Sequence, residues 1–275
     1  MVDFTRLNEV RCRRPLIHCI SNIVTANDCA NLALAAGASP MMAQEPREMA
    51  DITAAAEATV LNTGTPDEAR FEACLICGRE AEKLGRPVVL DPVGVGASPW
   101  RLERTGELLR QFIPTLLRVN LGEAQALLRI NSQEKGVDSP APAPQSQRIE
   151  TAVRLARRYG TAVLLSGPED IVTDGTDAWC VSGGSEWMSR VTGTGCMLSV
   201  LCGVFAAAEP DALTAGVLAA AFWKTCSSRA EAAGRGTGSF RTALLDEASV
   251  LTAAELSKES RLKKLTGDFS SLGER

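Results

Sequence analysis

The feature of this sequence that most constrains its fold is the alternation of short, almost wholly apolar runs with longer segments of helical periodicity. Five apolar runs are expected to be strands, at residues 15–20, 59–62, 87–91, 116–120 and 161–165. Runs that are apolar throughout fit strands covered on both faces, as in parallel sheets between helical layers. The segments between them predict helices at 26–36, 66–84, 102–112 and 150–159. This alternation predicts βαβ units, and so an α/β fold with a mostly parallel sheet.

Further along the chain the pattern changes. Residues 171–173 and 178–181 flank the turn-forming segment 174–177, which predicts a hairpin. After Gly193 the apolar positions follow helical spacing, and three alanine-rich helices are expected at about 196–208, 212–233 and 240–256. We therefore expect the sheet to end before a final helical layer.

Two segments have the composition of irregular structure. Residues 131–148 include the run Ser-Pro-Ala-Pro-Ala-Pro, which removes backbone donors and predicts a surface loop. The tail 257–275 is rich in charge and is predicted to fray. Because the chain has no internal repeat and a length common for one α/β domain, residues 1–275 are predicted to form a single domain.

Charge and hydropathy exclude several classes of partner. The net charge is −4 and the pI about 5.3, with Lys and Arg scattered, so we expect no nucleic acid and no membrane as partner. Residues 1–14 are not followed by a signal-type apolar stretch, and no window approaches the roughly 20 apolar residues that span a bilayer. These observations predict a cytoplasmic protein with a small-molecule ligand.

The cysteines and the single histidine are expected to be structural. The nine cysteines, an odd number, lie mostly in apolar runs, where buried reduced thiols are common. Cys74 and Cys77 have redox-motif spacing, but they lie mid-helix without a second pair or a nearby histidine, which favours core packing. His18 lies on an apolar strand, which favours a core position over a catalytic one.

The strongest local signal for chemistry is the segment 191–197, Val-Thr-Gly-Thr-Gly-Cys-Met, directly before an apolar helix. Its glycines allow a ligand to approach the backbone closely, and the unpaired N–H groups of the first helical turn attract an anion. Such donors would stabilise the charge on a phosphoryl group during transfer. An ordinary threonine-capped helix start has the same pattern, and spacing alone does not separate the two interpretations.

Cys196 falls in the first turn of this helix. The helix dipole is expected to lower the pKa of a thiol at that position, which makes Cys196 a candidate catalytic base. The alternative is a small side chain that packs the helix start.

Carboxylates follow two of the predicted strands. Asp91 ends the run 87–91 before a Pro-Val-Gly turn, and Glu123 lies three residues after Asn120 at a helix start. At the carboxyl ends of strands, these side chains could reach a hydrated Mg²⁺ and phosphate oxygens. Capping is the alternative, with Asp91 in a turn and Asn120 paired with Glu123 in a capping box.

A polar patch follows the first predicted strand. It comprises His18, Asn22, Thr25 and Asn27, and the segment 37–42, Gly-Ala-Ser-Pro-Met-Met, comes one helix later. Together these residues could line a pocket for a small heteroaromatic ring.

Six segments, taken in order, resemble the hydroxyethylthiazole kinases, a ribokinase-like family of thiamine biosynthesis and salvage. They are PLIHCISNIVT, ALAAGASPMMA, VLNTGT, VVLDPVGVGASPWR, the pair Asn120 and Glu123, and RVTGTGCM, within about residues 13–245. The resemblance implies a three-layer α/β/α sandwich and an enzyme that transfers the γ-phosphoryl group of ATP, with Mg²⁺, to the hydroxyl of 4-methyl-5-(2-hydroxyethyl)thiazole. It also implies a homotrimer with active sites at the subunit interfaces.

The resemblance assigns roles to matching positions. Cys196 takes the catalytic position, while Asp91 and Glu123 fall in the metal and phosphate region. The substrate-binding positions are Met42, Gly193 and Asn22. The ATP-binding positions are Arg118, Ser166, Asn120, Thr192, Thr194 and Gly195.

Departures from the family pattern leave alternatives open. The segment 119–123, Val-Asn-Leu-Gly-Glu, stands where the family has Gly-Asn-Ala-x-Glu, and Ser166 stands where it often has Thr. Two other ribokinase-like activities could use the same phosphate cradle and are retained, namely hydroxymethylpyrimidine kinase and NAD(P)H-hydrate dehydratase. A non-catalytic sensor of thiazole or nucleotide is the alternative outside enzymes.

Overall fold

The central element of the fold is a β-sheet that runs through the whole molecule. The computed structural model describes residues 2–129 and 143–266, and within these ranges the sheet has nine strands. In spatial order they are β2 (Ser39–Met41), β1 (Leu16–Ile20), β3 (Ala58–Asn62), β4 (Val88–Asp91), β5 (Leu116–Val119), β6 (Ala162–Leu165), β7 (Asp170–Thr173), β8 (Ala178–Ser182) and β9 (Arg261–Leu265). Neighbours from β2 to β6 pair in parallel, and neighbours from β6 to β9 pair antiparallel. The predicted mostly parallel sheet is confirmed, and so is the predicted hairpin, β7–β8.

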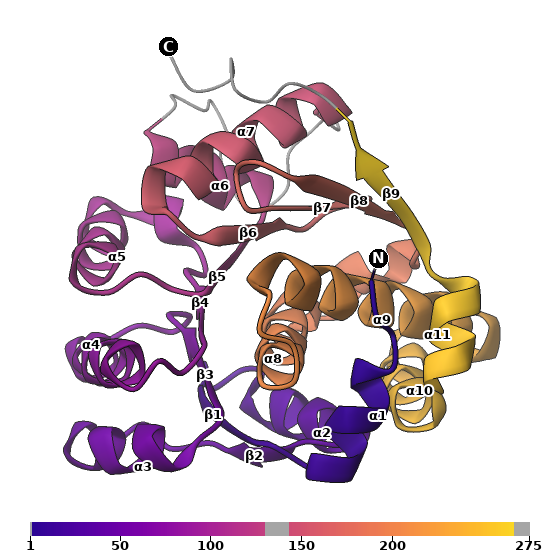
Figure 1. Ribbon diagram of the computed structural model, residues 1–275, viewed down its shortest axis with the longest axis horizontal. Coiled ribbons are helices and arrows are strands. Elements are labelled where there is room, and N and C mark those ends of the chain that lie inside the picture. The colour runs from indigo at the N-terminus through magenta and orange to yellow at the C-terminus, as the bar shows by residue number, and fades with distance from the viewer. Residues whose placement is uncertain (1, 130–142, 267–275) are drawn as a thin grey trace.

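Helices cover both faces of the sheet (Figure 1). One face carries α3 (Met49–Ala55), α4 (Glu68–Lys83), α5 (Pro99–Gln111), α6 (Leu121–Leu128) and α7 (Gln145–Tyr159). The other carries α1 (Arg6–Arg13), α2 (Ala26–Ala36), α8 (Thr194–Ala206), α9 (Ala212–Ala233), α10 (Thr237–Val250) and α11 (Ala253–Glu259). Each face has its own hydrophobic core, so the expected three-layer α/β/α sandwich is confirmed.

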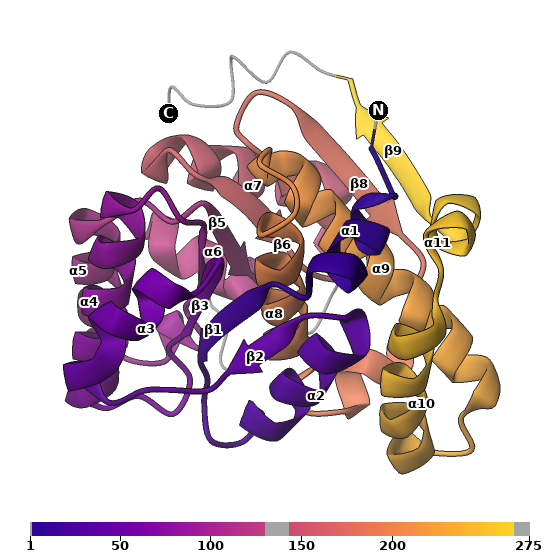
Figure 2. The same cartoon turned by 60° about the horizontal axis from the view of Figure 1, so that its bottom comes forward.

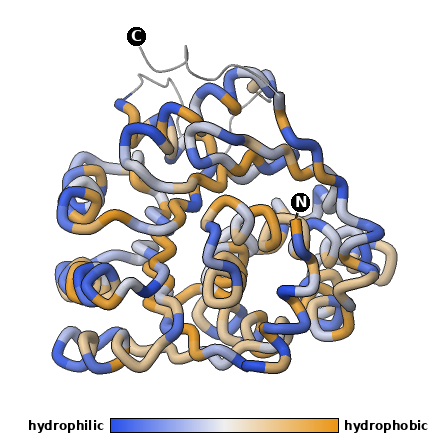
Figure 3. Tube along the Cα trace, in the orientation of Figure 1, coloured by the Kyte–Doolittle hydropathy of each residue, from blue (hydrophilic) through white to orange (hydrophobic). Residues whose placement is uncertain are grey.

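The central strands form where the sequence is apolar because both of their faces are buried. All five residues of β3 are buried, and successive side chains of a strand point to opposite faces. Val60 accordingly joins the core beneath α8, whereas Leu61 joins the core beneath α4. Figure 3 shows hydrophilic and hydrophobic colour alternating along α4 and α5, as expected for helices with only one face on the sheet.

Three predictions about the C-terminal part were wrong. The helix expected at 240–256 is two helices, α10 and α11, because Thr252 caps a new helix start with Glu255 in a capping box. The sheet does not end before the helices, because β9 returns and pairs with β8 (Figure 2). The tail expected to fray from residue 257 is therefore ordered through α11 and β9 as far as 266.

Only residues 143–148 of the loop expected at 131–148 lie within the described ranges. Residues 145–148 are helical, since α7 begins at Gln145, directly after Pro144. Residues 130–142 lie outside the described ranges.

Sequence reasoning missed several short elements near the N-terminus. These are α1, the three-residue edge strand β2, α3, and the 3₁₀ turn η1 (Pro46–Glu48). Two further 3₁₀ turns, η2 (Val95–Ala97) and η3 (Glu186–Arg190), lie in loops that border the site described below. Short elements carry too few residues for a periodic pattern to be read.

The structural interpretation of the cysteines and of His18 is confirmed. All nine cysteines are free, and only Cys12 is exposed and Cys196 half-buried. The His18 ring is fully buried, with Nε2 3.1 Å from the Ala43 carbonyl oxygen. Across the described parts of the chain, no helix is both long and apolar enough to cross a bilayer.

Candidate active site

Polar side chains gather where the parallel strands of the sheet end. Asn62 ends β3, Asp91 ends β4 and Arg118 lies in β5, while Asn22 and Ser166 follow β1 and β6. Since parallel strands point the same way, their carboxyl ends form one edge, which is where open α/β sheets bind ligands. The first turn of α8 lies against this edge, as the contacts below show.

Asp91 is the centre of the cluster. Its side chain is fully buried, and its Oδ2 accepts hydrogen bonds from Asn62 Nδ2 at 2.9 Å and from Ser199 Oγ at 2.7 Å. Its Oδ1 has no hydrogen-bond partner among the described residues and lies 3.6 Å from Arg118 Nη1. Burial, aided by the nearby Glu123 carboxylate, raises the pKa of Asp91 to about 6, against the opposing effect of Arg118. The Asp91 carboxyl is thus poised to change charge near neutral pH.

The start of α8 is open on the ligand side. Gly193 stands at the N-cap with φ +86°, and no side chain caps the first N–H groups. Glycine is required there twice over, because the left-handed backbone disfavours a Cβ and because that Cβ would overlap Thr25 Cγ2. A Cβ on Gly195 would lie 2.6 Å from Arg118 Nη2, so the guanidinium packs on this turn. The first helical N–H groups and the Arg118 cation therefore lie close together.

Cys196 is held in the cluster by an asparagine pair. Asn22 Nδ2 donates to Cys196 Sγ at 3.3 Å and to Asn62 Oδ1 at 3.1 Å. Burial and the Asp91 charge raise the pKa of the Cys196 thiol, so the expectation that the helix dipole would lower it was wrong. A thiol in this setting stays protonated at neutral pH and can position a substrate hydroxyl better than it can deprotonate one.

Glu123 has both carboxylate oxygens engaged by backbone. Oε1 accepts from Gly94 N and Oε2 from Asn120 N, each at 2.9 Å, and Asn120 Oδ1 accepts from Glu123 N at 2.8 Å. The capping-box interpretation of Asn120 and Glu123 is confirmed. Glu123 thereby fixes the turn after β4 that follows Asp91.

Asp91 and Glu123 still offer carboxylate oxygens to a magnesium ion. The unpartnered Asp91 Oδ1 retains its full acceptor capacity, and each Glu123 oxygen retains a lone pair for a metal-bound water. No group of three or more His, Cys, Asp or Glu that could hold a metal occurs in the ranges 2–129 and 143–266. The residues therefore fit a hydrated Mg²⁺ that is bound largely through phosphate oxygens, and do not form an all-protein metal site.

A pocket of about 650 Å³ opens beside the start of α8. Four of the predicted ATP-binding residues line it, namely Arg118, Ser166, Thr194 and Gly195. Ser166 Oγ accepts a hydrogen bond from Arg118 Nη2 at 2.6 Å, which joins the pocket wall to the Asp91 cluster. The other two differ, since Asn120 is a helix cap and Thr192 is exposed, and neither lines the pocket.

The predicted polar patch near the N-terminus divides between site and surroundings. Asn22 joins the cluster and Thr25 packs on Gly193, but His18 lies in the core and Asn27 is exposed on α2. Met42 follows β2 at the same edge of the sheet and is half-buried against the α8 core.

Three residues of the site escaped sequence reasoning. Asn62 and Ser199 orient the Asp91 carboxylate, although Asn62 could have been noticed as a polar residue that ends an apolar strand. Arg70 of α4 is 6% exposed, and it donates from Nη1 to the Ser21 carbonyl at 2.5 Å and from Nη2 to Gln44 Oε1 at 3.1 Å. Arg70 thereby ties the loop that carries Asn22 to the loop that carries Met42.

Comparison with solved structures places this fold in a known class. A ribokinase-like superfamily protein from Enterococcus faecalis superposes with a TM-score of 0.62 at 12% identity, covering 89% of this chain and 93% of that chain. The fold of this chain is therefore ribokinase-like.

The particular family follows from closer relatives. The Hydroxyethylthiazole kinase family matches residues 7–254. A hydroxyethylthiazole kinase from Methanoculleus marisnigri is 43% identical over 258 residues, 94% of this chain and 92% of that protein. The structure of a hydroxyethylthiazole kinase protein from Pyrococcus horikoshii superposes with a TM-score of 0.88 at 32% identity, covering 96% of this chain and 98% of that one. The chain belongs to the hydroxyethylthiazole kinase family.

Proposed function

We propose that the chain transfers the γ-phosphoryl group of ATP to the hydroxyl of 4-methyl-5-(2-hydroxyethyl)thiazole, forming its phosphate for thiamine biosynthesis. The observation that carries the proposal is the uncapped start of α8, which lies between the buried Asp91 and a pocket large enough for a nucleotide. The family membership supports the choice of acceptor.

In the proposed reaction the substrate oxygen forms a bond to the γ-phosphorus while the bond to the β–γ bridging oxygen breaks and ADP leaves. The N–H groups at residues 194–196 and the Arg118 guanidinium stabilise the charge on the transferring oxygens. A Mg²⁺ ion bound with ATP would neutralise phosphate charge, and Asp91 and Glu123 would hold its water ligands. The ATP base and ribose would occupy the pocket beyond Ser166.

Cys196 is the proposed catalytic residue, with a positioning task. Its Sγ lies beside Asn22 Nδ2 and Asp91, and the raised pKa keeps the thiol neutral. Because phosphoryl transfer passes through a loose transition state in most analyses, the alcohol can keep its proton until the new P–O bond is largely formed. The proton then passes to an oxygen of the transferred phosphoryl group and from there to solvent. Cys196 and Asn22 would orient the hydroxyl, with Met42 and Gly193 beside the thiazole ring.

A homotrimer with active sites at the subunit interfaces remains our proposal for the assembly. Large apolar side chains lie exposed on the segments between β1 and β2, with Ile23 at 75%, Val24 at 60%, Leu34 at 52% and Met41 at 37%. They belong to the loop after β1, which carries Asn22, to α2, and to the edge strand β2, which Met42 directly follows. Burial of this surface by a neighbouring copy would complete the thiazole pocket. We also propose a cytoplasmic location, where ATP is available.

The test is a panel of acceptors with ATP and Mg²⁺, with ADP release and product mass measured in parallel. Thiazole alcohol, hydroxymethylpyrimidine and hydrated NADH are compared. We expect stoichiometric ADP and thiazole phosphate with the first acceptor only. Turnover of another acceptor instead would reassign the activity within the ribokinase-like class, and tight thiazole binding without ADP release would indicate a sensor.

A further inference from the structure

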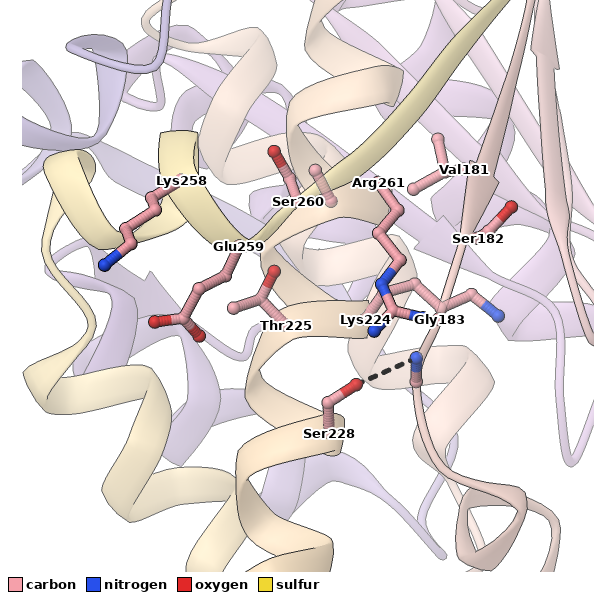
Figure 4. Close-up of a pocket in the computed structure, with 12 residues that line it drawn as sticks. Val181, Ser182, Gly183, Lys224, Thr225, Ser228, Lys258, Glu259, Ser260 and Arg261 are labelled. Carbon is pink, nitrogen blue, oxygen red and sulfur yellow. Dashed lines mark hydrogen bonds between the residues drawn. The ribbon is translucent and has the colours of Figure 1, made fainter.

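A second, smaller pocket lies apart from the catalytic cluster. It has a volume of about 370 Å³ and lies between the end of β8, α9 and the turn from α11 into β9 (Figure 4). None of the residues discussed above as binding substrate, ATP or metal lines it. The pocket is large enough for a phosphate group with a small substituent.

The charge of this pocket is positive. Arg261 and Lys258 line it, and neither forms a salt bridge within the described parts of the chain. The one acidic residue in the lining, Glu259, is already paired, since Arg229 donates to it from Nε at 2.9 Å and from Nη2 at 2.5 Å. These bonds lower the pKa of Glu259, although Arg229 also contacts Glu255 at 3.0 Å and Glu247 at 3.6 Å. In the lining itself the cations Arg261, Lys258 and Lys224 outnumber this single acid. Arg261 and Lys258 are left to attract an anion.

Arg261 and the hydroxyls of α9 face one another across the pocket. A Cβ on Gly183 would lie 3.9 Å from both Arg261 Cδ and Ser228 Oγ, so the two side chains flank the same glycine. Figure 4 shows the Arg261 side chain extending from β9 toward Gly183 and Ser228, with Thr225 nearby on α9. Thr225 is 5% exposed and forms no hydrogen bond with another described residue. The Thr225 hydroxyl is therefore available to donate a hydrogen bond to a ligand in this pocket.

The smaller pocket adjoins the large one. Gly183, Gly184 and Lys224 line both. The Lys224 ammonium donates to the Gly167 and Pro168 carbonyls at 2.8 and 2.9 Å and lies 3.5 Å from Asp170, on the side of the large pocket. An occupant of the small pocket would therefore contact the stem of a side chain whose head borders the nucleotide.

We propose that this small pocket binds an oxyanion of the phosphate class, held by the Arg261 guanidinium together with the Thr225 and Ser228 hydroxyls. Guanidinium suits this role because its planar fork matches the geometry of phosphate oxygens. Through the shared Gly183–Gly184 segment and Lys224, the occupant changes the affinity of the large pocket for nucleotide, and nucleotide changes the affinity for the anion by the same factor.

The experiment is equilibrium dialysis of radiolabelled orthophosphate with the full chain, with and without a saturating non-hydrolysable ATP analogue and Mg²⁺. The analogue blocks phosphate sites in the large pocket, so the remaining binding reports the small one. The variants are Arg261→Ala and the near-isosteric Thr225→Val, with Lys263→Ala as the matched control. Lys263 is an exposed cation on the same strand that does not line the pocket.

We expect one phosphate per chain in the presence of the analogue, with affinity lowered roughly tenfold or more by Arg261→Ala and several-fold by Thr225→Val, and unchanged by Lys263→Ala. Equal loss in the Lys263→Ala control, or no effect of Arg261→Ala, would overturn the proposal. Complete loss of phosphate binding on addition of the analogue would also overturn it, since the pocket would then belong to the nucleotide site. If the analogue itself fails to bind, the proposed kinase function fails. The effect of Arg261→Ala on phosphate affinity can still be measured without the analogue, so the two failures are distinguishable.

Discussion

Replacement of Gly193 by alanine tests the packing that opens the start of α8. Two costs add at this position: the left-handed backbone at φ +86°, about 1–2 kcal/mol for a residue with a Cβ, and the overlap of that Cβ with Thr25 Cγ2, about 1–3 kcal/mol. The new Cβ would also lie 3.1 Å from Thr25 Cβ, so rotation of the Thr25 side chain alone relieves only part of the overlap. We expect Gly193→Ala to lower the free energy of unfolding by about 2–5 kcal/mol.

A matched control separates the two costs. Gly160 has φ +63° at the end of α7, and a Cβ there would meet nothing within 4 Å. Gly160→Ala should therefore cost only the backbone part, about 1–2 kcal/mol. Thr25→Ser removes the overlapping Cγ2 methyl and keeps the hydroxyl and the 3.1 Å contact with Cβ. In that background the cost of Gly193→Ala should therefore fall part of the way toward the Gly160→Ala value.

The assay is urea unfolding of the four single and double variants, followed by circular dichroism, with turnover measured on the same samples. Turnover of Gly193→Ala should fall more than that of Gly160→Ala, because the Thr25 loop also carries Asn22. Equal destabilisation by Gly193→Ala and Gly160→Ala, or no relief by Thr25→Ser, would refute the contact on which this reasoning depends.

Three further predictions concern the cluster. Cys196→Ala should lower turnover by about 10- to 100-fold while leaving the nucleotide dissociation constant within about twofold, because the thiol positions only the acceptor; unchanged turnover would remove Cys196 from the mechanism. Arg70→Met should raise the KM for the thiazole alcohol far more than the KM for ATP, because Arg70 connects the loops that carry Asn22 and Met42. Arg70→Lys should restore part of the loss. Equal changes in both KM values would count against this positioning role. Because the pKa of Asp91 is raised to about 6 from its ordinary 3.8, the folded state favours the protonated acid, and that contribution is present below about pH 4 and lost as the pH rises through 6. The free energy of unfolding of the wild type, relative to Asp91→Asn, should therefore fall by about 2 kcal/mol between pH 4 and pH 7 in urea titrations. A flat or rising difference would show that Asp91 is not held in this environment.

The central fold was predictable because its strands are buried on both faces. In β3 and β4 every residue is buried, and burial on two faces demands the apolar runs that the sequence shows. β9 was not predicted because three of its five residues, Arg261, Lys263 and Lys264, are cations. Such a composition is typical of an edge strand with an exposed face and gives no apolar run. The break between α10 and α11 depends on a cap at Thr252 that helical periodicity alone does not reveal.

The location of the site was predictable from the sequence, whereas the protonation state of Cys196 and the hydrogen-bond partners of Asp91 were not. Asp91 and Cys196 follow from a strand end and from the glycine-flanked helix start, whereas Arg118 was implied only by the family resemblance. The structure brings the three together. The direction of the Cys196 pKa could not be read from its place on α8, because it depends on burial and on an acid more than a hundred residues away in the chain. Asn62 and Ser199 were missed for the same reason, since their role is defined only by contact with Asp91.

The central claim is that the open start of α8 and the Asp91 cluster guide a phosphoryl group from ATP to a thiazole alcohol. The most direct measurement is a single-turnover, rapid-quench experiment with ATP labelled at the γ-phosphate, excess enzyme, Mg²⁺ and the thiazole alcohol. The account predicts that label leaves ATP and appears in thiazole phosphate. Label that stays in ATP, or that appears only as inorganic phosphate, would contradict it.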